Sequence, residues 1–239
     1  MNILITGGGR GLGKLIVENL SKPNNHIFIL DRLPNDKVDP DFLKNKSNYY
    51  EVDLIDFESV KKILDEVISK YGGIDVIINN AANRDFNSIE QFTEGDIVKN
   101  VKVNFETPIL LIGKILPSMI KNNFGRIINI SSISGLKGYS KGTLYCSTKS
   151  SLMVFTESLA SDLSLLRKNI TANAILPDSF QTKEGEKLEN NEYVTSTIIK
   201  MTNKIINTNV NGKIQVISPF FKKIKELLKA LNAQYNRFY

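Results

Sequence analysis

The chain has 239 residues, of which 41% are hydrophobic and 23% are charged, and its formal net charge is +6. This length suits a single α/β domain with a substantial core, and this composition is that of a soluble globular protein. Because the chain has one cysteine, Cys146, and one histidine, His26, it can form neither an internal disulfide nor a His/Cys metal cluster, and we expect no metal site.

The distribution of charged and apolar residues limits the partners that we expect. Lysines and arginines are scattered among acidic residues through most of the chain, which indicates a solvated surface and no nucleic-acid site. No window approaches the roughly 18 to 20 apolar residues of a membrane span, and the first residues predict a strand instead of a leader peptide. We therefore expect a cytoplasmic protein that binds neither nucleic acid nor a membrane.

A glycine-rich turn follows the first predicted strand, residues 2–5, and precedes a helical pattern that begins at Leu12. Its glycines let the backbone turn tightly and let a large group approach without meeting a Cβ: Gly7, Gly8, Gly9, Gly11 and Gly13. The unpaired N–H groups at the start of the helix favour an anion. The stretch therefore predicts a phosphate-binding turn.

Two nucleotide motifs match this turn. Gly8 and Gly13-Lys14 fit a Walker-type loop, but Leu15 stands where that loop needs a Ser or Thr to bind magnesium. The spacing TGxxxGxG, which starts at Thr6, instead fits a variant of the dinucleotide fingerprint. We therefore favour a dinucleotide over a triphosphate.

Apolar runs and helical patterns alternate along the rest of the chain. Further buried strands are expected at 26–30, 48–52, 74–82, 126–130, 170–176 and 213–217. Further helices are expected at 57–71, 92–120, 144–166 and 193–206, with a kink or split at Pro108 and Pro117 and a polar loop or lid at 178–192.

This alternation defines the fold class and the domain organisation that we expect. It predicts an α/β protein with a single-domain Rossmann fold, a doubly wound seven-stranded parallel sheet with helices on both faces. The domain covers residues 1–217. A C-terminal helical extension is expected at 218–239, where apolar residues recur at helical spacing among lysines.

An acidic residue, Asp31, ends the second predicted strand, 18 residues beyond Gly13. At this position the dinucleotide fold places an acid on the adenosine ribose, and its charge would repel a 2′-phosphate, which favours NAD. Arg10 and Arg32 have the opposite effect, because either guanidinium could pair with that phosphate. We expect NAD and keep NADP as the alternative cofactor.

A second group of polar residues lies in the other half of the chain. Ser131 and Ser132 follow the fifth predicted strand, at the sheet edge where ligands bind in open α/β sheets. Tyr145 and Lys149 are four residues apart near the start of a helix and so share a face. Because a nearby ammonium favours the phenolate, the pair predicts a proton donor or acceptor.

As a set, these motifs resemble the short-chain dehydrogenase/reductase family, and within it the 3-oxoacyl-ACP reductases, over about residues 2–217. The matching stretches follow in the family's order: Thr6–Gly13, Asp53-Leu54, Asn79-Asn80-Ala81-Ala82, Asn104, Gly125–Ser132, Tyr145-x3-Lys149, and Pro177 with Thr182. Ala82 and Asp178 stand where the family has glycine, and the added side chains could crowd the cofactor.

The resemblance implies an NAD- or NADP-dependent oxidoreductase that transfers a hydride between the cofactor and a small alcohol or carbonyl substrate. In the implied catalytic set Tyr145 exchanges the proton, Ser132 hydrogen-bonds the substrate oxygen, Lys149 holds the nicotinamide ribose and Asn104 anchors a water. The resemblance also implies a homodimer or homotetramer, commonly through the helices of residues 106–121 and 144–166.

The expected cofactor contacts come from the glycine turn, the residues after several strands and the catalytic pair. They are Gly7, Gly9, Arg10, Gly11, Leu12, Gly13, Asp31, Arg32, Asp53, Leu54, Asn80, Ala81, Ala82, Tyr145, Lys149, Pro177 and Thr182. Two other functions are weighed against this one. A catalytically silent nucleotide-binding regulator is supported mainly by Asp178, and a sugar-nucleotide-modifying enzyme is disfavoured by the glycine spacing and the chain length.

Overall fold

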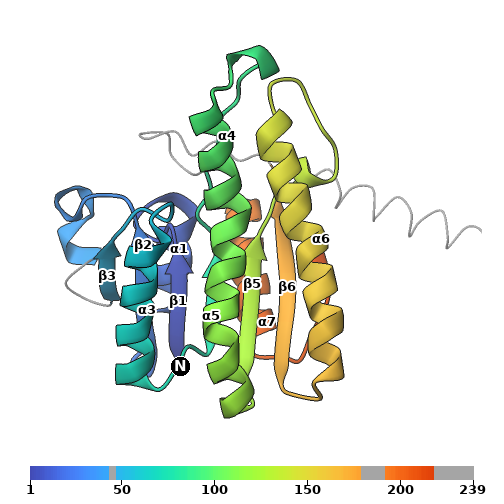
Figure 1. Ribbon diagram of the computed structural model, residues 1–239. Helices are drawn as coiled ribbons and strands as arrows, with labels where there is room; N and C mark the ends of the chain where they lie inside the picture. The colour runs from blue at the N-terminus through green and yellow to red at the C-terminus, as the bar shows by residue number, and fades with distance from the viewer. Residues whose placement is uncertain (43–46, 179–191, 218–239) are drawn as a thin grey trace, which may run out of the picture.

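The computed structural model describes residues 1–42, 47–178 and 192–217. Its centre is one seven-stranded parallel sheet in the order β3-β2-β1-β4-β5-β6-β7 (Figure 1). The strands are β1 (Asn2–Thr6), β2 (His26–Asp31), β3 (Ser47–Glu51), β4 (Val76–Asn79), β5 (Gly125–Ile130), β6 (Ile170–Pro177) and β7 (Ile214–Ile217). The predicted Rossmann fold is confirmed.

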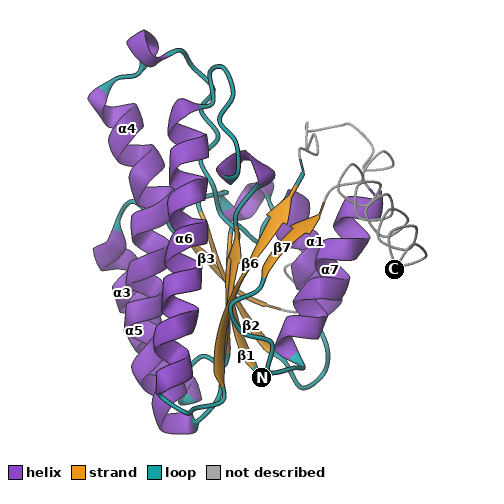
Figure 2. Cartoon of the chain, turned by 90° about the vertical axis from the view of Figure 1, so that its right-hand side faces the viewer, coloured by secondary structure: helices purple, strands orange, loops and turns teal. Residues whose placement is uncertain are grey.

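Helices cover both faces of this sheet (Figure 2). One layer contains α1 (Gly11–Leu20) and α7 (Glu192–Ile206), and the other contains α3 (Phe57–Tyr71), α5 (Thr107–Asn122) and α6 (Thr143–Leu165). The helix α4 (Glu94–Val101) extends the second layer beyond the sheet. Shorter helical turns are η1 (Asn35–Lys37), η2 (Ile89–Gln91), η3 (Lys102–Glu106) and η4 (Ile133–Gly135).

The central strands are mostly apolar because both of their faces are buried. In β1, Ile3 and Ile5 pack in the core beneath α1 and α7, whereas Leu4 points into the core beneath α3, α5 and α6. Side chains alternate between the faces of a strand, so a strand between two helical layers needs apolar residues on both faces. This requirement explains the continuous apolar runs of the sequence.

The strand order reverses beside β1, which pairs with β2 on one side and with β4 on the other. Loops that leave the carboxyl ends of β1 and β4 therefore diverge to opposite sides of the sheet, and open α/β sheets bind ligands at such a point. Strand β4 ends at Asn79, so the predicted strand 74–82 was too long at both ends. Residues 80–82 are free to enter the loop at this edge.

The helix expected to break at its prolines instead continues from α4 through η3 to α5. The segment η3 is a π-helical turn, in which the Thr107 N–H donates to the Lys102 carbonyl. Pro108 then lies in the first turn of α5, where the missing N–H of proline has little cost. Pro117 lies inside α5 and does not end it. A kink or a split was predicted at these prolines, and the split was wrong because the helix continues through both.

This continuous stretch, Glu94–Asn122, is the one described helix that is long and apolar enough to cross a membrane. By length and composition, this helix therefore differs from the expectation that no window approaches a membrane span. In the structure, 44% of its apolar window is buried, with Leu111, Ile112 and Ile115 in the core. These contacts are those of a core helix in a layered α/β fold.

Two predicted features lie outside the described residues. They are most of the polar loop or lid at 178–192, which includes Thr182, and the helical extension at 218–239.

Candidate active site

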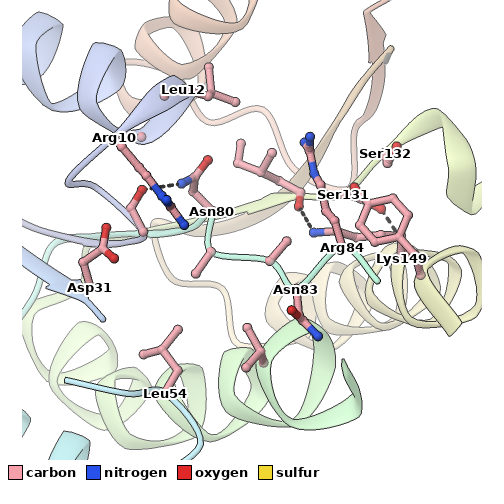
Figure 3. Close-up of a pocket in the computed structure, with 18 of the residues that line it drawn as sticks. Arg10, Leu12, Asp31, Leu54, Asn80, Asn83, Arg84, Ser131, Ser132 and Lys149 are labelled. Carbon is pink, nitrogen blue, oxygen red and sulfur yellow. Dashed lines mark hydrogen bonds between the residues drawn. The ribbon is translucent and has the colours of Figure 1, made fainter. Parts of the chain in front are cut away.

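A cleft of about 740 Å³ lies over the carboxyl ends of the strands. It collects most of the predicted cofactor residues from separate parts of the chain: Gly7, Arg10, Gly11, Leu12, Gly13, Asp31, Arg32, Asp53, Leu54, Asn80, Ala81, Ala82, Tyr145, Lys149 and Pro177. Ser132 also lines it, whereas Gly9 and Asn104 lie behind its surface. Figure 3 shows Arg10 and Asp31 at one end and Ser131, Ser132 and Lys149 at the other.

The glycine turn is joined to the end of β4 by hydrogen bonds. The Asn80 amide donates to the carbonyl oxygens of Thr6 (3.1 Å) and Gly7 (2.9 Å). In return the Thr6 hydroxyl accepts from the backbone N–H groups of Asn80 (3.0 Å) and Ala81 (3.1 Å). The polar residues after β4 thereby hold the turn against the point where the strand order reverses.

No side chain fits at the closest point of this turn. A Cβ on Gly13 would lie 1.9 Å from the Gly7 carbonyl oxygen and 2.8 Å from the Asn80 amide nitrogen. Gly7 has a positive φ of 66°, which favours glycine. Helix α1 has no side-chain cap at Arg10 and no acidic residue in its first turn. A phosphate fits these uncapped N–H groups, as the pyrophosphate of a dinucleotide would require.

Asp31 is held rigidly at the other side of the turn, and it is 7% exposed. Its carboxylate accepts from the backbone N–H of Gly9 at 2.8 Å and from that of Leu33 at 3.0 Å. Tyr49 packs behind it and donates its hydroxyl to the Leu33 carbonyl at 2.6 Å. Gly9, expected to contact the cofactor, is therefore placed to orient Asp31.

Lys149 is the most deeply buried charged group of the cleft, with 2% of its surface exposed. Its Nζ donates to the Ile130 carbonyl at 2.7 Å, and the Ser131 hydroxyl donates to the Lys149 carbonyl at 2.7 Å. Burial, together with a smaller effect of the Arg84 charge, lowers the pKa of Lys149 to about 7. The Lys149 ammonium lies 5.9 Å from the centre of the Tyr145 ring, as expected for a pair four residues apart on α6.

The Ser132 hydroxyl is positioned by the turn that follows β5. Its oxygen accepts from the Ser134 N–H at 3.1 Å, and its proton is directed to the Ser134 hydroxyl at 3.1 Å. A hydroxyl rotates easily, so the same oxygen can redirect its proton to a ligand in the cleft. Ser132 can therefore hydrogen-bond a ligand oxygen without movement of the backbone.

Asn104 joins the helix α4–η3–α5 to the loop after β4. It is 1% exposed, its Oδ1 accepts from the Asn83 N–H at 2.7 Å, and its Nδ2 donates to the Asn83 carbonyl at 2.9 Å. The same Nδ2 also donates to Thr148 on α6 at 3.1 Å. Pro108 has no N–H to give the Asn104 carbonyl, which is the bond that an α-helix would make there. The side chain of Asn104 thus orders the loop after β4.

Several residues that line the cleft were not predicted from the sequence as site residues: Leu30, Asn83, Arg84, Asp85, Val103 and Ile130. Ser131 was placed at this sheet edge but was not predicted to contact the cofactor. Asp178, noted only as a departure from the family pattern, also lines the cleft. Arg84 lies beside Ser131 and Lys149 in Figure 3. Its position two residues after the Asn79–Ala82 motif was the one available signal.

The comparisons with known proteins agree with this geometry. The family model described as short chain dehydrogenase matches residues 1–193. Over 184 residues the chain is 32% identical to 3-oxoacyl-[acyl-carrier-protein] reductase FabG of Aquifex aeolicus. The matched region covers 75% of this chain and 73% of the relative. Over 192 residues it is 29% identical to the probable galactose dehydrogenase GalD of Rhizobium meliloti, covering 78% and 74%.

Solved structures share the fold. ElxO with NADP bound superposes with a TM-score of 0.78 at 26% identity, covering 90% of this chain and 96% of that one. The 4-hydroxyisoleucine dehydrogenase complexed with NADH superposes with a TM-score of 0.80 at 21% identity, covering 91% and 96%. At 21% identity the second likeness concerns the fold alone.

A Rossmann sheet, a glycine turn against its switch point and a Tyr-Lys pair at the far end of one cleft define a dinucleotide-dependent oxidoreductase. More narrowly, the chain belongs to the short-chain dehydrogenase family. It transfers a hydride between a nicotinamide cofactor and a small alcohol or carbonyl substrate, as the sequence predicted.

The contact between Gly13 and Gly7 predicts the effect of one added methyl group. Gly13→Ala should weaken binding of the reduced cofactor at least about tenfold, because the Cβ displaces the turn. Cofactor fluorescence titration measures the affinity. Gly95→Ala on α4 is the control, since its Cβ would meet only the Thr93 hydroxyl at 3.7 Å. Unchanged affinity in Gly13→Ala would contradict this account of the turn.

The lowered pKa of Lys149 predicts a pH-dependent stability. Above pH 7 the folded chain releases this proton, while the unfolded chain keeps it to about pH 10. The free energy of unfolding should therefore rise with pH by about 1.4 kcal/mol per unit between pH 7 and 9, and Lys149→Met should lose this rise.

Urea unfolding of both proteins at several pH values measures the difference. Lys114→Met is the control, because Lys114 is a partly exposed residue ion-paired with Asp65. Parallel curves for wild type and Lys149→Met would show that Lys149 does not titrate in this range.

Proposed function

We propose that this chain is an NAD-preferring dehydrogenase/reductase in which Tyr145 is the general acid and base. The main support is that one cleft contains Ser132, Tyr145 and Lys149 together with the glycine turn of the dinucleotide site. When bound, the nicotinamide cofactor supplies or accepts the hydride, and the protein supplies orientation and a proton. In this proposal the substrate oxygen lies between Ser132 and Tyr145.

The proposed roles follow from the positions of the side chains. During reduction Tyr145 gives its proton to the substrate oxygen, and during oxidation it takes that proton back. Ser132 turns its hydroxyl from Ser134 toward the same oxygen. Lys149, one helical turn from Tyr145, donates to the nicotinamide ribose. Its contact with the Ile130 carbonyl holds it at this depth.

Asn104 has an indirect role in this proposal. Its side chain is occupied by Asn83 and Thr148, so its backbone carbonyl is the group that would anchor a water for the proton relay. The π-helical turn η3 and Pro108 support this, because together they interrupt the regular α-helical bonding at this residue. Asn104 is thus proposed to assist the proton transfer through water and to order the loop.

Tyr145→Phe tests the reaction directly. This variant should lose at least about 100-fold in kcat, because the ring stays and the proton donor is removed. Its affinity for the reduced cofactor should stay within about twofold of wild type, since the phenol is not needed to hold the dinucleotide. Activity is followed by cofactor absorbance with a panel of alcohols, sugars and 3-oxoacyl thioesters. Full activity in Tyr145→Phe would overturn the assignment.

The preference for NAD rests on Asp31. Its carboxylate is fixed by the N–H groups of Gly9 and Leu33, so it cannot turn away from a 2′-phosphate. A carboxylate in this position accepts hydrogen bonds from the ribose hydroxyls of NAD. Arg10 and Arg32 line the same end of the cleft and could reduce the discrimination against NADP, but both are exposed and surround a fixed charge.

The two reduced cofactors provide the test of this preference. NADH should bind at least about tenfold more tightly than NADPH, because like charges near the ribose are costly. Asp31→Asn should reduce that ratio. Asp53→Asn, which changes a second carboxylate of the cleft, should affect both affinities equally. Tighter binding of NADPH by the wild type would refute the preference.

We propose a cytoplasmic homodimer or homotetramer, assembled through the helices of residues 106–121 and 144–166, that binds neither nucleic acid nor a membrane. Exposed apolar residues on these helices, Leu110, Val154 and Leu165, support such an interface. The complete set of Asn104, Ser132, Tyr145 and Lys149 argues against a silent regulator. The glycine spacing and the chain length argue against a sugar-nucleotide-modifying enzyme.

A further inference from the structure

Two exposed aromatic side chains lie beside Tyr145 and away from the adenosine end of the cleft. Phe86, in the loop after β4, is 47% exposed, and Tyr139, in the loop after η4, is 46% exposed. Single exposed apolar residues are ordinary on soluble proteins. These two contact one another, with ring centroids 6.2 Å apart and planes tilted by 44°. We call this pair the aromatic wall.

The aromatic wall is continuous with the ring of Tyr145. Phe86 meets Tyr145 in an edge-to-face arrangement, with centroids 5.6 Å apart and an interplanar angle of 70°. Tyr145 itself is only 4% exposed, so the wall begins where this buried ring meets the surface. Phe86 therefore lies next to the residue that is proposed to meet the substrate oxygen.

The loop that contains Phe86 is held in place before any substrate binds. Asn104 holds both backbone groups of Asn83. The Asp85 carboxylate accepts from the amides of Asn83 at 2.5 Å and Asn100 at 3.1 Å. A preorganised surface binds more tightly because less conformational freedom is lost on binding. The position of Phe86 is therefore a property of the resting protein.

Tyr139 is connected to the catalytic elements from the other side. Burial raises the pKa of Tyr139, and a hydrogen bond with the Ser134 side chain opposes this rise. Ser134 in turn bonds the Ser132 hydroxyl. Both members of the wall are thus linked through short contacts to residues that would hold the substrate oxygen.

We propose that the aromatic wall contacts the substrate, and that the substrate is an alcohol or ketone with an aryl or similarly flat apolar group on its reacting carbon. This inference rests on the proposed function of Tyr145. Aromatic rings gain from edge-to-face and offset stacking beyond the area that they bury, by about 2- to 10-fold in affinity. A saturated group of the same size lacks that gain.

The test measures binding and needs no turnover. The full-length protein is saturated with oxidised cofactor, with which a ketone cannot be reduced. It is then titrated with acetophenone and, separately, with cyclohexyl methyl ketone, which has a saturated ring of similar size. Calorimetry or ligand-observed NMR gives each Kd. We expect acetophenone to bind about 2- to 10-fold more tightly.

Variants assign this preference to the aromatic wall. Phe86→Leu and Tyr139→Leu should each bring the two ketone affinities closer together, whereas Tyr139→Phe keeps the ring and should retain the preference. Cofactor affinity should stay unchanged in all three. Phe155→Leu is the matched control, because it removes one ring of another edge-to-face pair, with Phe105 at 6.3 Å. It should leave the preference intact.

Three results would overturn the proposal. They are equal affinities for the two ketones in the wild type, no measurable binding of either, and an undiminished preference in both Phe86→Leu and Tyr139→Leu. Failure of the proposed function looks different. Preferred binding of acetophenone without hydride transfer to any carbonyl compound would support the aromatic wall and refute the proposed function. Turnover of substrates without an aryl preference would support the proposed function and refute the role of the aromatic wall.

Discussion

The close approach of the first helix to the end of β1 is the constraint on which the cleft depends. Gly13 lies so near the Gly7 carbonyl that no Cβ fits between them, and Asn80 bonds the same carbonyl from the end of β4. The turn is therefore fixed at the point where the strand order reverses. The uncapped start of α1, which the phosphates of a dinucleotide would meet, is positioned by this contact.

At each end of the cleft, backbone hydrogen bonds hold a buried charged group, and the two groups have opposite charges. At one end the Asp31 carboxylate accepts two backbone N–H groups, and at the other the Lys149 ammonium donates to one backbone carbonyl. A buried charge is costly unless it is hydrogen-bonded, so these backbone contacts make the burial tolerable and also fix the direction of each group. The site is in this sense organised before a cofactor binds.

Local relations along the chain were the ones that could be predicted. The alternation of apolar runs and helical patterns determined the Rossmann fold, because buried parallel strands need apolar residues on both faces. The glycine spacing determined the turn, and the four-residue spacing of Tyr145 and Lys149 placed both on one face of α6. The helix with Pro108 was the exception, since a π-helical turn moved the proline to a position that tolerates it.

Contacts between separate loops were decided only by the tertiary structure. By itself the sequence predicted the fold, the glycine turn before α1 and the shared helix face of Tyr145 and Lys149, because each depends on spacing within one or two neighbouring elements. It did not reveal that Gly9 holds Asp31, that Asn104 clamps Asn83, or that Phe86 and Tyr139 meet beside Tyr145. Those contacts join residues from 21 to more than 50 positions apart, and the packing of the elements, not any local pattern, brings them together.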